Sequence, residues 1–480
     1  MRLLGSAALL AALAACSTSV PILQPQAQDR LPGRWPQAWT QQPVSTADHR
    51  ATRLAWQDVY PDPALQTLIR AALAHNQDLR LALLRVQEAQ AAYDIQRAAR
   101  LPTVGLGSSH ARARVPADLN ASGRSVVAGD QQVFVGLNSW ELDLWGRVKS
   151  LSDAALGNYL ALEATRHAVQ SSLVKQVALN YLALRSLDER LALTRRTIAS
   201  REESLRIFKR RTEVGATSRY ALTQVQTLVH QAQTIGTQLA QQRALQANAL
   251  QQLTGMDAQR LPLDPSEPFR LKPVPEGLPS DLLTQRPDIV AAEYGLQAAR
   301  ANVAAARAAF LPRIALTGSW GTASAELDGL FKGGSRAWQF APSISLPIFD
   351  GGQRQANLNL QAVRQNMAVV QYEKTIETAM REVLDALSSR TTLEQQLTVL
   401  TEQRAALQER ARLARLRYDQ GASPYLDVLD AERDLLSAEQ QLVQGREALL
   451  SAQVALHAAL GGGYGVPDPG SATPTEPLQP

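Results

Sequence analysis

Residues Arg417 to Asp430 read R-Y-D-Q-G-A-S-P-Y-L-D-V-L-D, and this stretch separates two long segments that lack proline. Glycine adopts positive φ without steric cost, so Gly421 is the expected end of the first segment. Ser423 and Pro424 are typical of a helix start, with serine as the N-cap and proline at the first helical position. The stretch therefore predicts a sharp turn between two long helices.

The same kind of turn occurs earlier in the chain, where Arg211 to Thr217 read R-T-E-V-G-A-T. Gly421 lies 206 positions after Gly215 (421 − 215). The glycines that end the following segments, Gly255 and Gly461, are separated by the same interval. A turn that recurs in register with its flanking helices indicates an internal repeat.

A second block recurs as well, because Asp78–Pro102 matches Asp288–Pro312 without a gap, and both copies end in Leu-Pro. Apolar and polar residues alternate after each copy, as they do in β-strands. In the first half we expect strands at about Thr103–Ala113 and Gln132–Leu144, with a bulge in the second because its alternation changes phase. Pro342 is unfavourable for a central strand. The apolar face of the two second-half strands comprises Ile314, Leu316, Gly318, Trp320, Trp338, Phe340, Ile344, Leu346 and Ile348.

These strands form two predicted hairpins, and each strand is long enough to cross a membrane, which takes about 9–11 residues in a barrel. Four strands cannot close a barrel, and an open sheet leaves unpaired backbone groups that lipid cannot satisfy. Either the strands are soluble or several chains share one barrel. Three chains would supply about twelve strands, which is within the known range.

The segments between the hairpins and the turns are about 65 residues long, so as helices they would span roughly 100 Å. Helices of that length indicate a coiled coil or a cylinder of helices. The sequence thus divides into a predicted signal peptide (1–15), an N-terminal strap (16–77), a first repeat (78–260), a proline-rich linker (261–287), a second repeat (288–461) and a disordered tail (462–480).

The N-terminus has a short positive start followed by an apolar run from Leu3 to Ala15, which is typical of a secretory signal peptide. Leu13 to Cys16 resemble the bacterial lipoprotein signal, in which the cysteine is acylated and becomes the new N-terminus. Position 17 is a serine and not an aspartate. By the same resemblance, this implies that the lipoprotein is sorted to the outer membrane. The alternative is a buried or accidental cysteine. Beyond residue 16 no apolar run of about 18 residues occurs, so no transmembrane helix is predicted.

Composition excludes several classes of protein. The chain is 45% hydrophobic with a net charge of +5, an excess too small to indicate nucleic acid as a partner. One cysteine excludes a disulfide framework. The six histidines show no metal-ligand spacing, and no phosphate-binding glycine loop is present. We therefore predict a protein that is not an enzyme and has no metal or cofactor other than the lipid on Cys16.

Taken together, these motifs resemble the outer-membrane efflux protein family of TolC-like trimeric ducts, in the lipoprotein branch typified by OprM and NodT. The resemblance covers nearly the whole mature chain. It implies a homotrimer with a 12-stranded transmembrane β-barrel, continued by a 12-helix periplasmic α-barrel. It rests on Leu-Ala-Ala-Cys16, Asp62-Pro-Ala-Leu65, Leu101-Pro102, Trp140 to Arg147, Gly277-Leu-Pro-Ser280, Arg286-Pro-Asp288, the two turns and Asp427-Val-Leu-Asp430.

The resemblance also assigns site residues. Asp427 and Asp430 lie on one helix face and would form a ring of carboxylates at the pore constriction, where such rings favour cations. Their alternative role is to complement a helix dipole. Tyr418 matches a residue that holds the pore closed, or else it only packs between helices. The expected adaptor-contact tips are Val214, Gly215, Ala216, Thr217, Gln420, Gly421, Ala422 and Ser423.

The function that these features favour is a passive exit duct for drugs or small toxic compounds in the outer membrane of a Gram-negative bacterium. The resemblance implies two further partners, a periplasmic membrane-fusion adaptor and an inner-membrane pump of the resistance-nodulation-division type. A type I protein-secretion duct is an alternative. A lipid-tethered periplasmic scaffold without a pore is another, but a scaffold does not need strands with apolar faces.

Overall fold

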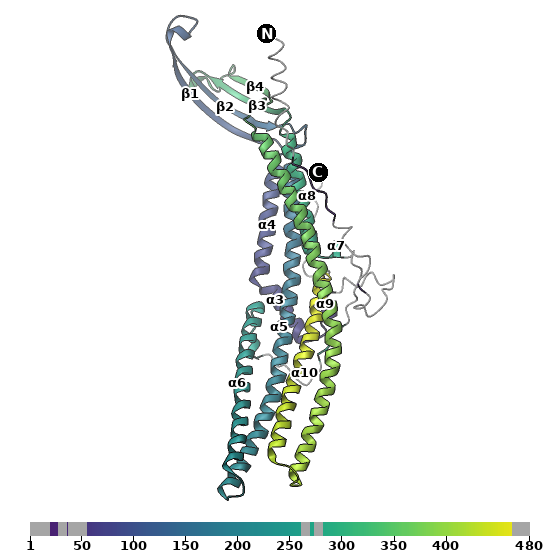
Figure 1. The fold of residues 1–480 in the computed structure, drawn as a ribbon. Coiled ribbons are helices and arrows are strands. Elements are labelled where there is room, and N and C mark those ends of the chain that lie inside the picture. The colour runs from purple at the N-terminus through teal and green to yellow at the C-terminus, as the bar shows by residue number, and fades with distance from the viewer. Residues whose placement is uncertain (1–19, 27–35, 37–54, 261–268, 273–281, 463–480) are drawn as a thin grey trace. The chain divides into compact units, whose positions relative to one another are not determined.

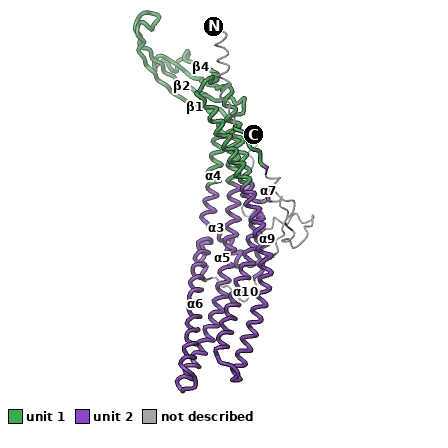
Figure 2. The backbone as a smooth tube through the Cα atoms, in the orientation of Figure 1, with its two compact units in different colours: residues 1–25, 85–162, 291–373 green, residues 26–84, 163–290, 374–480 purple. Residues whose placement is uncertain are grey.

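The structure is a computed structural model that describes residues 20–26, 36, 55–260, 269–272 and 282–462. The predicted signal peptide with Cys16, half of the strap, most of the linker and nearly all of the tail lie outside the described residues. The chain forms two compact units, and Figure 2 colours them green and purple. The first comprises residues 1–25, 85–162 and 291–373, and the second comprises residues 26–84, 163–290 and 374–480.

The long helices have the lengths that the sequence predicts. Helices α5 (Arg147–Glu213) and α9 (Gln353–Asp419) contain 67 residues each. They are followed by α6 (Arg219–Thr254) and α10 (Tyr425–Ala459) (Figure 1). Helices α4 (Gln77–Ala98) and α8 (Pro287–Ala308), which contain the second recurring block, have 22 residues each. The remaining described α-helices are α2 (Trp56–Val59), α3 (Pro63–His75) and α7 (Leu282–Gln285).

The first unit contains one antiparallel sheet in the order β1-β2-β3-β4 (Figure 1). Its strands are β1 (Val104–Val115), β2 (Val126–Glu141), β3 (Arg313–Ser324) and β4 (Arg336–Ser345). In the same unit α5 and α8 approach closely, because a Cβ on Gly157 would lie 2.9 Å from the Cβ of Ala298.

The expected strand boundaries were wrong at three places. β2 ends at Glu141 and not at Leu144, because the chain turns there and the N–H of Leu144 donates to the carbonyl of Leu142. β2 begins at Val126, earlier than position 132, because residues 126–131 pair with β1 through backbone bonds although they show no alternation of apolar and polar side chains. Leu346 and Ile348 follow the end of β4 and are not part of it. Pro347 lies between them without an N–H to donate, and its carbonyl accepts a hydrogen bond from Arg354.

The predicted bulge in β2 is confirmed. The pairing of β2 with β3 shifts register between Leu137 and Trp140, where β2 has one more residue than its partner. Ser139, inside the shift, has a φ of 36°, a positive value that only glycine adopts elsewhere in the described chain. Pro342 lies in β4, which is an edge strand within one chain, and proline is tolerated in edge strands.

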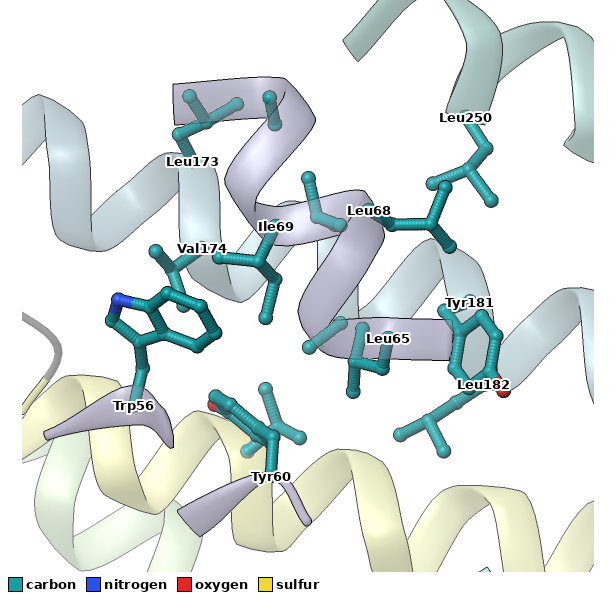
Figure 3. Packing of buried hydrophobic residues seen from close by; sticks show 14 of the residues in the cluster. Trp56, Tyr60, Leu65, Leu68, Ile69, Leu173, Val174, Tyr181, Leu182 and Leu250 are labelled. Carbon is teal, nitrogen blue, oxygen red and sulfur yellow. The ribbon is translucent and has the colours of Figure 1, made fainter. Parts of the chain in front are cut away.

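The core of the second unit forms where α2 and α3 pack on α5 and α6. Figure 3 shows Trp56, Leu65, Leu68 and Ile69 facing residues of the two longer helices, and Tyr60 beside α10. The ring of Tyr60 lies 5.6 Å from that of His457 on α10. Their partners include Leu173, Val174, Tyr181, Leu182 and Leu250. None of the helices in the described part of the chain combines the length and the apolar character that a membrane-spanning helix needs.

The caps of the short helices follow the sequence in one case and not in another. Asp62 caps α3 as its neighbour Pro63 suggests, accepting bonds from the N–H groups of Ala64 and Leu65. Asparagine can end a helix in a left-handed conformation, but Asn76 at the end of α3 has a φ of −66°. Its side chain instead accepts hydrogen bonds from the N–H groups of Asp78 and Leu79, so it caps the start of the next helix.

Candidate functional site

The two turns at the ends of the helical hairpins have the same backbone geometry. Gly215 has a φ of 75° and Gly421 a φ of 71°, as the sequence predicts for glycines that end helices. The N–H of Ala216 donates to the carbonyl of Arg211 over 2.7 Å, and that of Ala422 donates to the carbonyl of Arg417 over 2.8 Å. In each turn a backbone N–H thus donates to the carbonyl of the residue five positions earlier.

The helices that follow the turns start in different ways. In α6, Ser218 is the N-cap, and its Oγ accepts a hydrogen bond from the N–H of Ala221. The prediction of Ser423 as the N-cap of α10 was wrong, because Pro424 holds that position with an extended ψ of 154°. Among the described residues, the buried Oγ of Ser423 has no hydrogen-bond partner.

Beside the turns, the two hairpins pack together around Tyr425. Its ring lies between that of Phe208 on α5, at 4.7 Å, and that of Tyr418 on α9, at 4.8 Å. Val225, Val428 and Leu429 complete the buried part of this cluster, which we call the Tyr425 cluster. Apolar contact therefore joins α5 and α6 to α9 and α10 close to the tips.

Two hydrogen bonds reinforce the Tyr425 cluster. The hydroxyls of Ser204 and Tyr425 lie 2.5 Å apart, and Nη1 of Arg211 donates to the hydroxyl of Tyr418, also over 2.5 Å. Sequence reasoning identified Tyr418 but missed its partner Arg211 and the whole Ser204–Tyr425 pair. An aromatic residue directly after Ser423-Pro424 was the only available signal, since the partners lie more than 200 positions away.

A buried arginine, Arg201, and a half-buried glutamate, Glu432, lie beside the same cluster. Arg201 is only 2% exposed, and its Nη1 donates to the carbonyl of Leu228 over 2.8 Å. Its Nε and Nη2 have no hydrogen-bond partner among the described residues. Burial lowers the pKa of Arg201, although the charge of Glu432 opposes that shift. Burial likewise raises the pKa of Glu432, against the attraction of Arg415 and Arg201.

Asp427 and Asp430 have different surroundings. Asp427 is exposed on the first turn of α10, and no hydrogen bond or ion pair of its side chain occurs within the described chain. Asp430 is half-buried and lies 3.1 Å from Nη1 of Arg433. Arg433 also contacts Asp434, which binds Arg410 over 2.7 Å. The structure therefore places Asp430 in a mixed-charge network and leaves Asp427 as the open carboxylate.

The tip of the first hairpin differs in its chemistry. Ala221 and Gln224, at the positions that match the two aspartates, carry no charge. Ala221 packs against the Tyr425 cluster. Val214 and Tyr220 are 69% and 73% exposed on either side of the turn. This tip therefore presents apolar surface, and only the second half of the chain supplies carboxylates at these positions.

Helical hairpins of this length, combined with a four-stranded antiparallel sheet, define a class of bacterial outer-membrane channels. The open-state MtrE outer membrane channel of Neisseria gonorrhoeae superposes with a TM-score of 0.81 at 36% identity, covering 94% of this chain and 99% of that one. A membrane protein from Pseudomonas aeruginosa gives a TM-score of 0.84 at 41% identity, covering 93% and 100% of the two chains.

The family model "Outer membrane efflux protein" matches residues 68–256 and 278–462, so the chain belongs to that family. The outer membrane protein OprJ of Pseudomonas aeruginosa is 42% identical over 465 residues, which is 96% of each chain. The toluene efflux pump outer membrane protein TtgI of Pseudomonas putida is also 42% identical, over 95% of this chain and 97% of its own.

These findings confirm the resemblance that the sequence motifs suggested. The chain is an outer-membrane efflux protein, and its family is one of channels and not a class of enzymes.

Proposed function

We propose that this chain forms the exit duct of a tripartite efflux system, as a homotrimer that conducts small toxic compounds passively through the outer membrane. Three chains would close a 12-stranded barrel and continue it as a 12-helix cylinder built from the two repeats of each chain. The single observation that carries the proposal is the distribution of side chains on the sheet.

One face of the sheet is apolar across all four strands. Trp320 on β3 pairs with Trp338 on β4 and with Val135 on β2, which in turn pairs with Leu106 on β1. Paired residues of adjacent strands lie on the same face. These four side chains are between 46% and 80% exposed, so the described residues leave them largely uncovered. Such a face suits contact with lipid, whereas a periplasmic scaffold has no use for it.

The opposite face of β3 and β4 has small and polar residues. Ser319 pairs with Gln339, and Ala315 pairs with Ser343. A polar inner face and an apolar outer face are the pattern of a membrane barrel. Within one chain β1 and β4 are edge strands, and lipid cannot satisfy their free backbone groups. Closure with two further copies removes these edges and supports the trimer.

The hairpin tips carry the remaining roles. We assign Asp427, Asp430 and Tyr418 to the pore constriction, because Tyr418 joins the two hairpins and the aspartates follow the turn within two helical turns. The adaptor would contact residues 214–217 and 420–423, and the inner-membrane pump would supply the energy. The names of the relatives, which include toluene, solvent and antibiotic efflux proteins, support efflux over protein secretion.

We expect the purified protein to be a detergent-requiring trimer that conducts ions in planar lipid bilayers. Closing the barrel buries every strand edge, so the assembly needs an apolar environment around its outer face. Mass determination in detergent and single-channel recording test this together. A water-soluble, non-conducting species would rule out the duct and favour the lipid-tethered periplasmic scaffold instead.

We further propose that Cys16 is acylated, and that replacing Cys16 with serine removes the lipid and weakens retention in the outer membrane without preventing folding. Barrel strands insert through their own closure, so the lipid is an additional anchor. Labelling with a fatty-acid analogue, together with fractionation of membranes, measures both effects. Persistent labelling of the Cys16→Ser variant would show that the signal sequence has been misassigned.

A further inference from the structure

Asn366 on α9 binds the backbone of the described N-terminal segment (residues 20–26) at two places. Nδ2 of Asn366 donates to the carbonyl of Pro21 over 2.8 Å, and Oδ1 of Asn366 accepts from the N–H of Leu23 over 2.9 Å. Both partners lie more than 340 positions away in sequence, within the same compact unit. One amide therefore makes two hydrogen bonds to alternate backbone groups of one segment.

Asn366 binds backbone groups of the N-terminal segment and not its side chains. An asparagine amide carries both a donor and an acceptor, so it can replace the neighbouring strand of a β-ladder for residues i and i+2. Pro21 and Pro25 have no N–H, which limits the donors of the segment between them to residues 22–24. Leu23 is 47% exposed, so packing of its side chain does not explain the contact.

The position of Asn366 on α9 matches the reach of the chain from Cys16. Asn366 lies 13 residues after Gln353, the first residue of α9, which corresponds to about 20 Å along the helix. Cys16 precedes Pro21 by five residues, which span at most about 17 Å when extended. When the segment is bound at Asn366, Cys16 can therefore reach almost as far as the start of α9, the helix that follows β4.

We propose that Asn366 is the docking site for the segment that follows the acylated cysteine, and that it fixes the lipid anchor at a set distance from the ends of the strands. The bound segment then acts as a spacer between α9 and the inner leaflet. The spacer role rests on the proposed acylation of Cys16, whereas the docking itself does not.

Hydrogen exchange at the Leu23 amide, measured on the purified protein in detergent, tests the docking. The native protein should protect this amide, and Asn366→Ala should accelerate its exchange by about tenfold, the loss expected for one hydrogen bond. Asn357→Ala is the matched control, because Asn357 lies on the same helix but binds Gln361 and not the N-terminal segment. An unprotected Leu23 amide in the native protein, or equal exchange in Asn366→Ala and the native protein, would overturn the proposal.

A shortened spacer tests the link to the lipid. Deleting residues 18–20 leaves Ser17 beside Cys16 and reduces the reach to about 7 Å. The tether should then pull Leu23 away from Asn366, so the Leu23 amide should lose its protection from exchange in the acylated protein. When Cys16→Ser is added to the same deletion, the Leu23 amide should remain protected. Protection in both backgrounds would overturn the spacer role. Absence of fatty-acid label on the native protein would instead contradict the acylation and leave the docking intact.

Discussion

Replacing Asp427 and Asp430 with alanine should abolish block of the channel by divalent and trivalent cations, raise its conductance and weaken its preference for cations. Three copies would bring about six carboxylates to the throat, and a ring of carboxylates attracts and retains multivalent cations. Single-channel recording with and without a trivalent cation measures all three changes. The matched control is the double replacement of Ala221 and Gln224, which occupy the equivalent positions of the uncharged first tip.

The two aspartates should not contribute equally. Asp430 is already compensated by Arg433 at 3.1 Å, whereas Asp427 is exposed without an ion pair in the described chain. Asp427→Ala alone should therefore remove more of the cation block than Asp430→Ala alone. If selectivity is unchanged in the double variant while stability falls, the aspartates serve only the dipole of α10.

Removing the hydroxyls of Tyr418 and Tyr425 should open the periplasmic end. Tyr418→Phe removes the acceptor of Arg211, and Tyr425→Phe removes the partner of Ser204, while both rings keep their packing in the Tyr425 cluster. Each hydrogen bond contributes about 1 kcal/mol, so losing two per chain in a trimer shifts the balance between closed and open states by orders of magnitude. We therefore expect the double variant to rest in the open state, with a conductance about several-fold higher than that of the native protein.

The test combines channel recording with sensitivity of cells to a large antibiotic that the closed duct excludes. Tyr220→Phe is the control, because Tyr220 lies at the first tip, is 73% exposed and has no hydrogen bond within the described chain. Each single variant should have an intermediate effect. A double variant with the resting conductance of the native protein would show that the two bonds stabilise the chain without closing the pore.

The sequence predicts those parts of the fold that depend on local patterns. Gly215 and Gly421 marked both turns because a positive φ favours glycine, and the absence of proline marked the two 67-residue helices. The phase change before Trp140 located the bulge in β2. These signals need only neighbouring residues, so a single sequence contains them.

Contacts between distant segments could not be predicted in the same way. The hydrogen bond between Ser204 and Tyr425 joins residues from different repeats, and nothing in either local pattern identifies the other partner. The ion pair of Asp430 with Arg433 is local, but the network that continues from Arg433 through Asp434 to Arg410 includes a residue of another helix. The sequence therefore suggests candidate residues near the turns, but not the distant side chains that they contact.

The register between β2 and β3 has a consequence for the order of folding. Residues of β1 and β2, and likewise of β3 and β4, are close in sequence, so each hairpin can form early by closing a short loop. Joining Glu141 to Ala315 closes a loop of about 170 residues, whose entropic cost falls only once α5 to α8 are in place. We therefore expect the helices to assemble before the two hairpins meet, so that an interruption in α5 or α6 should delay the sheet even though neither helix contributes a strand.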